Sequence, residues 1–393
     1  MSITTVGQAE QQRGSTQSGV DNVWTISSVV VGSGVALLAL LLGPLLVGQY
    51  IEELGVSEAH AGIILSTELS AFALGAAALF AVLGQNWRRI VTIALLLMAI
   101  GNALFLFVES VPAVVVARFI AGFGAGMLMT MTMQVIALMR DPDRIYGLWT
   151  VVQLLLGAAA MIAFPAVIAY GGIKAVFLIW ALMGVLLFAT IQFYPPGRDQ
   201  NIKPERQKAA ARRFVLGLLC LFGLFVYYSG QTGVWVYLER LGDSWGISQE
   251  MVAYTLFASL IAGIAGSGLA ILLGKKLGRT VPIKASLLFS AAGISLLIQS
   301  GGATLFTVAA CLFNFGWYLF LPYITAVIAA ADDSGKLLTG LAVTFPASLA
   351  AGPALAAMLI DRSGTLLPGL IFGLLSIPFG WVFILPATRA KSS

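Results

Sequence analysis

Two charged side chains, Glu68 and Arg118, lie inside long apolar stretches of the sequence. A carboxylate can take up and release a proton, and a nearby guanidinium can hold it ionised or bind an anionic group. A charge at the centre of a lipid bilayer costs about 2.5 to 3.5 kcal/mol, so such residues usually face a cavity and act there. We predict that Glu68 carries a proton and that Arg118 holds this carboxylate or binds an anion. The alternative is a static ion pair that joins two helices.

Two other apolar stretches contain clusters of aromatic and amide side chains. Aromatic walls with a few amide groups suit a small organic molecule that has a ring or a short apolar body. We predict that these residues bind such a molecule together with Arg118. In the alternative interpretation the aromatic rings only pack, and the amides bond neighbouring helices. The candidates are Tyr228, Gln231, Trp235, Asn314, Trp317 and Tyr318.

The composition excludes a water-soluble globular protein. The chain has 393 residues, of which 59% are hydrophobic and 10% charged, whereas soluble domains carry roughly 25% charged residues. The apolar residues come in blocks of about 20 and do not alternate with polar ones, which excludes a β-barrel. The 43 glycines have no period of three, which excludes a collagen-like chain. The sequence therefore predicts an all-α polytopic membrane protein.

Polar residues divide the apolar part of the chain into twelve stretches, each long enough to cross a bilayer. The segment before them is rich in Ser, Thr, Gln and Gly, which predicts a disordered tail over residues 1–26. A basic linker is predicted over 195–213 and a short tail over 388–393. The predicted spans cover residues 27–49, 60–83, 90–108, 112–138, 145–169, 173–194, 214–237, 250–273, 281–299, 303–330, 337–360 and 366–387.

The positions of the 22 Lys and Arg residues predict the orientation of the spans. With the N-terminus in the cytosol, 18 of them lie on the cytosolic side and three lie outside. Positive residues accumulate in cytosolic loops, so both tails and the linker are predicted to be cytosolic. The net charge of +5 follows from this topology and does not indicate a nucleic-acid partner. Short loops favour the inner membrane of a bacterium.

The two halves of the chain share a repeated pattern. Residues 50–55 read Tyr-Ile-Glu-Glu-Leu-Gly, and residues 237–242, which begin 187 positions later, read Tyr-Leu-Glu-Arg-Leu-Gly. After a four-residue insertion the offset becomes 191 and pairs Gly75 with Gly266. The repeat predicts two homologous bundles of six helices each. The bundles are predicted over residues 27–194 and 214–387.

The two buried charges belong to the first half only. At an offset of 191, Ser259 lies opposite Glu68 and Ala309 lies opposite Arg118. A charged pair that the second half lacks is no structural feature of the repeat. This asymmetry favours a specialised role in coupling.

The predicted fourth span has three regularly spaced glycines after its arginine. Arg118, Gly122, Gly124 and Gly126 resemble the R-x-x-x-G-x-G-x-G pattern of the major facilitator superfamily, in which glycines allow close helix packing. Loop residues after the second and eighth spans resemble that family's gating motif, although Gly84 replaces its aspartate. The matching loop residues are Arg88, Arg89, Lys275, Lys276 and Arg279.

The resemblance implies a secondary transporter in which two bundles rock around a central site. We predict uptake of a small organic anion together with protons, because Arg118 could bind the anion and the exporter signature around Pro165 is imperfect. One alternative is a proton-coupled exporter of aromatic or amphipathic compounds. A remote alternative is a sensor or scaffold that does not transport. The protein is expected to work as a monomer in the lipid bilayer.

Other chemistries have no support in the sequence. The two cysteines, Cys220 and Cys311, fall in opposite leaflets, and His60 is the single histidine. This disfavours both a disulfide and a metal site. The chain has no P-loop lysine motif, which argues against ATP as the driving force. We therefore expect no enzymatic activity, no metal and no cofactor.

Overall fold

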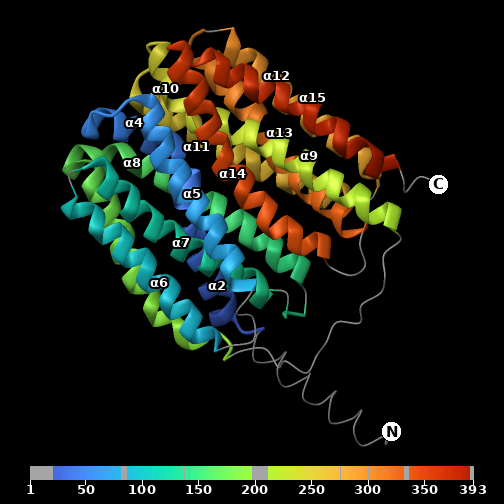
Figure 1. Cartoon of the computed structure of the whole chain (residues 1–393), viewed down its shortest axis with the longest axis horizontal. Coiled ribbons are helices and arrows are strands. Elements are labelled where there is room, and N and C mark those ends of the chain that lie inside the picture. The colour runs from blue at the N-terminus through green and yellow to red at the C-terminus, as the bar shows by residue number, and fades with distance from the viewer. Residues whose placement is uncertain are drawn as a thin grey trace, which may run out of the picture.

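A computed structural model describes most of the chain, and all regular structure in the described part is helical (Figure 1). The predicted tails and linker fall largely outside the described residues, at 1–20, 197–210 and 390–393. The described residues are 21–80, 86–108, 110–136, 138–140, 142–196, 211–274, 276–299, 301–331 and 336–389.

The first half begins with a broken helix and continues with longer ones. Pro44 lies in the first turn of α4, where its missing N–H breaks no helical bond. The break between α3 and α4 falls at Leu42, directly before Gly43 and Pro44. The elements are α2 (Val23–Ala36), α3 (Leu38–Leu41), α4 (Gly43–Leu54), α5 (Glu58–Phe80), α6 (Trp87–Leu104), η1 (Phe105–Phe107), α7 (Val111–Ile136), α8 (Pro142–Leu187) and η2 (Phe188–Phe193).

The second half repeats this order of helices. A short helix, α10, follows its first long helix, as α4 follows α2 and α3 in the first half. The elements are α9 (Ala211–Val236), α10 (Leu238–Ser244), α11 (Gln249–Leu273), α12 (Thr280–Ile298), α13 (Ala303–Ala329), α14 (Lys336–Ser363) and α15 (Leu367–Arg389).

The helices agree with the predicted spans. Ten helices in the described part of the chain are long and apolar enough to cross a membrane. One of them, Ile145–Phe193, contains two spans, because the backbone is non-helical at Gly171 and Gly172. Gly172 has φ +64°, a conformation that glycine adopts without steric cost. The predicted first span is divided among α2, α3 and α4, and each of these helices alone is too short to cross a membrane. With this span and the two spans in Ile145–Phe193, the structure is consistent with twelve spans.

Glycines bring helices into backbone contact in the same way in both halves. Gly101 of α6 lies against the backbone of Ala117 in α7, and Gly293 of α12 lies against that of Ala309 in α13. The equivalent residues are 192 positions apart, one more than the offset found at the second span. Gly124 and Gly316 show the same offset, and each lies against a carbonyl of the preceding helix. These shared contacts support two homologous bundles.

The structural offset corrects one residue pairing. With an offset of 192 positions, the counterpart of Arg118 is Ala310. The sequence comparison paired Arg118 with Ala309, which is one residue too early. A one-residue insertion between the second and fourth spans accounts for the difference. Ala310 is also uncharged, so the charge of Arg118 still has no counterpart in the second half.

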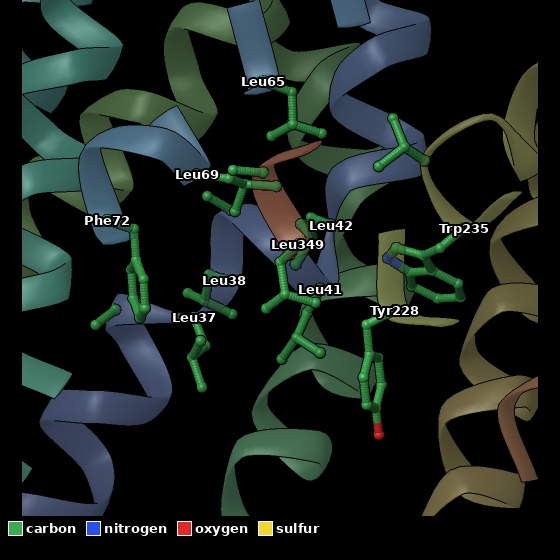
Figure 2. Packing of buried hydrophobic residues seen from close by; sticks show 14 of the residues in the cluster. Leu37, Leu38, Leu41, Leu42, Leu65, Leu69, Phe72, Tyr228, Trp235 and Leu349 are labelled. Carbon is green, nitrogen blue, oxygen red and sulfur yellow. The ribbon is translucent and has the colours of Figure 1, made fainter. Parts of the chain in front are cut away.

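The two halves meet along α5 with α14, α8 with α11, and α4 with α9 and α10. In Figure 1 the end that carries α4 and α10 is opposite the end at which α2 begins and α15 ends. We call the α4–α10 end the outer end, following the orientation predicted from the positive charges. Figure 2 shows leucines of the first half gathered near Tyr228 and Trp235 of α9. The halves thus bury an apolar layer between them.

Polar contacts between the halves lie from the middle of the molecule to its outer end. Within the described ranges they join Leu40 to Trp235, Ser66 to Ala350, Glu58 to both Tyr237 and Arg240, and Glu52 to Gln249. We conclude that this conformation is closed at the outer end.

Candidate functional site

Glu68 and Arg118 form an ion pair where α5 packs against α7. Nη1 of Arg118 donates to Oε1 of Glu68 at 3.1 Å. The Arg118 side chain is fully buried and Glu68 is 5% exposed. Gly122, one turn after Arg118, lies against the backbone carbonyl of Glu68, so no side chain separates the two helices. The glycine pattern thereby places the carboxylate within reach of the guanidinium.

Arg118 has further partners in the first half. Its Nη2 donates to Oδ1 of Asn102 at 2.8 Å and to the backbone oxygen of Gly101 at 3.2 Å. Its Cζ lies 4.1 Å from the centroid of the Phe177 ring, which is a cation–π distance. The guanidinium therefore keeps favourable contacts even when the carboxyl group of Glu68 is neutral.

The second oxygen of the Glu68 carboxylate is free of this pair. Oε2 is buried and has no hydrogen-bond partner among the residues that the structure describes. The Glu68 side chain lines a cavity between the halves, together with apolar residues that include Leu69, Phe72 and Leu349. The cavity offers about 10 Å³ to water, close to the lower limit for one molecule. A proton from the cavity could reach the pair through this oxygen.

The four aromatic candidates are held in tight packing. The hydroxyl of Tyr228 donates to the backbone oxygen of Trp317 at 3.4 Å, and their rings meet edge to face. Nε1 of Trp235 donates across to the backbone oxygen of Leu40 at 2.9 Å. The Tyr318 ring packs against α11. The structure brings Tyr228 and Trp317 together, and it places Trp235 at the contact between the halves (Figure 2).

The two amide candidates bond neighbouring helices of their own half. Nε2 of Gln231 donates to the backbone oxygen of Gly373 at 3.3 Å and to Oγ of Ser376 at 3.2 Å, both in α15. Nδ2 of Asn314 donates to Oγ of Ser259 in α11 at 3.0 Å. In this conformation both amides follow the helix-bonding alternative. Contact with a substrate stays a prediction for another state of the cycle.

The arginine of the first gating motif binds the end of η2. Nε of Arg88 donates to the backbone oxygen of Tyr194 at 2.7 Å, and Nη2 donates to that of Gln192 at 2.9 Å. Free carbonyls at a helix end attract cations, which explains this position. The other members of the two motifs are exposed (Arg89, Lys276), half-buried (Arg279) or outside the described residues (Lys275).

Sequence reasoning missed two residues of the site. Asn102 in α6 accepts from Arg118, and Phe177 in the sixth span stacks under the guanidinium. Asn102 is the one amide in the predicted third span, and a buried amide needs a partner, so this signal was present. Phe177 has no such signal, because many phenylalanines line apolar helices.

We predict that replacing Asn102 with leucine destabilises the protein by about 1 to 3 kcal/mol, because Nη2 of Arg118 loses its shortest hydrogen bond in a buried site. Thermal unfolding of the purified protein in detergent measures the change. Ile100→Leu, at an exposed position of the same helix, serves as the control and is expected to leave stability unchanged. Equal melting temperatures for Asn102→Leu and the native protein would contradict the role of this amide.

Comparisons with known proteins agree with this fold. The sequence profile described as Major Facilitator Superfamily matches residues 25–331, more than half of the chain. The chain therefore belongs to the major facilitator superfamily, and it is a membrane transporter and not an enzyme.

Two solved structures share the arrangement of helices. The structure of a D-xylose–proton symporter is 14% identical, with a TM-score of 0.73 over 93% of this chain and 99% of that one. A bacterial homologue of the human lysosomal transporter Spinster, inward-facing and unoccupied, is 13% identical, with a TM-score of 0.63 over 92% and 94% of the two chains. No match was found among curated protein sequences. At these identities the two structures establish the fold.

Proposed function

We propose that the protein transports a small solute by alternating access and couples this transport to protons through Glu68. The observation that carries the proposal is the Glu68 carboxylate, which has one oxygen on Arg118 and the other buried without a hydrogen-bond partner among the described residues, in a residue that lines a cavity between the halves. A group at this position can exchange protons with whichever side the cavity opens to. The bundles in this proposal cover residues 27–194 and 214–387, with both termini in the cytosol of a bacterium.

The surroundings of Arg118 suit a pair that is made and broken in each cycle. Protonation of Glu68 removes the negative charge, which would leave a buried cation uncompensated. Asn102, Gly101 and the ring of Phe177 offer that cation three other favourable contacts. These contacts reduce the energetic cost of the state in which Glu68 is protonated and neutral.

The cavity favours an apolar or cationic solute over an anion. Glu68 is the one charged residue among the described residues that line it, and the rest are apolar. Arg118 is fully buried behind Glu68, so an anion would have to displace the carboxylate to reach it. We therefore favour exchange of an aromatic or amphipathic compound for protons. Uptake of an organic anion with protons is the second candidate, and it requires Arg118 to be released.

Proton flux in proteoliposomes tests the two candidates. The protein is reconstituted with a pH-sensitive dye inside and exposed to lipophilic cations, aromatic acids or aliphatic acids. We expect cations to drive protons in the direction opposite to their own movement. Acids that carry protons with them would instead favour the symport candidate. If no member of the panel moves protons above the level of empty vesicles, proton coupling to these solute classes is refuted, and the sensor alternative gains support.

A further inference from the structure

The outer end contains a buried acidic side chain at the contact between the halves. Glu239 of α10 is 5% exposed, although most of its acidic neighbours reach solvent. Its carboxylate lies against Gly48 of α4, so closely that a methyl group on Gly48 would overlap it. Figure 1 shows α4 and α10 together at this end. The carboxylate is thus enclosed only when the two halves are in contact.

Among the described residues, a negative charge on Glu239 is offset by the nearby guanidinium of Arg240 but by no hydrogen bond to Oε2. This oxygen is buried without a hydrogen-bond partner among the described residues. The adjacent Arg240 is turned away, with Nη1 3.3 Å from Oδ2 of Asp243 and Nε 3.7 Å from Oε1 of Glu58. A buried carboxylate without a partner is costly in its ionised form.

The charged groups that act on Glu239 lie on α10 itself and on two helices of the first half. Asp243 and Arg240 lie on α10 itself, Glu52 on α4 and Glu58 at the start of α5. Neutral side chains bond two of these acidic residues. Gln249 of α11 and Gln49 of α4 donate to the carboxylate of Glu52 at 3.0 and 2.9 Å, and the hydroxyl of Tyr237 donates to the backbone oxygen of Glu58 at 3.0 Å. The exposed Glu250 of α11 adds another negative charge to this end. The negative groups outnumber the one arginine.

The pKa of Glu239 is raised to about 8, mainly because the carboxyl group is buried; Arg240 lowers this pKa, and Glu52, Asp243 and Glu58 raise it. A solvated glutamate has a pKa of about 4.3. At a pH between these two pKa values, Glu239 therefore takes up a proton when the outer end closes. The closed state is fully favoured at low pH and loses this advantage as the pH rises to about 8.

We propose that Glu239 is a second proton-binding residue, and that its protonation allows the outer end to close while its ionisation favours the open outer end. In the open state the carboxylate faces external water, so the external proton concentration controls closure. This proposal rests on alternating access but not on the identity of the solute or on Glu68. A metal ion does not explain the cluster, because the described residues contain no group of three or more side chains suited to hold one.

Distance measurements on the full-length protein test the proposal without any substrate. Spin labels are attached to Ser57→Cys and Ser244→Cys, two exposed positions on opposite halves of the outer end, after Cys220 and Cys311 are replaced with serine. Pulsed electron paramagnetic resonance then gives the closed fraction in lipid nanodiscs from pH 5 to pH 9. We expect the ratio of closed to open molecules to fall with rising pH by up to about tenfold per pH unit below about pH 8.

Four variants identify the responsible group. Glu239→Gln is expected to stay closed at every pH, whereas Asp243→Asn and Glu68→Gln should keep the pH dependence. Gly48→Ala, which forces the carboxylate out of its enclosed position, should open the outer end and shift the transition to lower pH. The proposal is overturned if Glu239→Gln changes with pH as the native protein does, or if the native protein shows no change. Should Glu239→Gln fail to fold, an unshifted transition in Gly48→Ala would also overturn it.

Discussion

Replacing Glu68 with glutamine is expected to abolish proton-driven accumulation of the solute while exchange of solute across the membrane continues. Glutamine has nearly the same shape as glutamate, and its Oε1 can still accept from Nη1 of Arg118. It cannot release a proton, so the variant stays in a state that resembles protonated Glu68. Exchange needs only the movement of loaded bundles, which this change leaves intact.

The measurement compares two fluxes in the same proteoliposomes: accumulation driven by a pH gradient, and exchange of labelled for unlabelled solute without a gradient. We expect accumulation to fall to the level of empty vesicles, with exchange within about twofold of the native rate. Thr67→Val is the control, because the hydroxyl of Thr67 bonds only the carbonyl of Ile63 in its own helix. Full accumulation by Glu68→Gln would leave the pair with a static structural role.

The ion pair could be predicted from the sequence because charges inside apolar spans are rare. Glu68 and Arg118 stand out by residue type alone, as the two charged side chains inside long apolar stretches. The number of spans and the repeat were also readable, since both rest on patterns of about 20 residues. The partners of Arg118 were harder to find, because Gly101 acts through a backbone oxygen and Phe177 through the face of its ring.

The substrate-binding residues could not be predicted with the same security. In a helix that is hydrophobic all round, the pattern does not show which face points to the other half. Gln231 and Asn314 are buried amides in either interpretation, and only the packing shows that they bond α15 and α11.

Glu239 shows a second limit of sequence reasoning. The sequence places it two residues after the predicted seventh span, among acids that would be solvated in an outer loop. Its burial results from contact with α4, which is almost 190 residues distant in the chain. A tertiary contact between residues so far apart in the chain leaves no local pattern.

Replacing Gly126 with alanine is expected to disrupt the packing of α5 against α7. The free energy of unfolding should fall by about 1 to 3 kcal/mol. A Cβ on Gly126 would overlap the backbone carbonyl of Phe72, and a backbone group cannot rotate away as a side chain can. The helices would have to separate. This would also pull Glu68, one turn from Phe72, away from Arg118, two turns from Gly126. Thermal unfolding in detergent, followed by tryptophan fluorescence, measures the loss.

The matched control for Gly126 is Gly268 in α11, where an added Cβ meets no atom within 4 Å. Alanine is also the better helix former, so Gly268→Ala is expected to leave the melting temperature unchanged or to raise it slightly. The contrast between the two variants separates close packing from helix propensity, since both make the same chemical change inside a helix. If Gly126→Ala melted as high as Gly268→Ala, α5 and α7 would not be in backbone contact. In that case the glycines could not be the reason why Glu68 and Arg118 lie within 3.1 Å of each other.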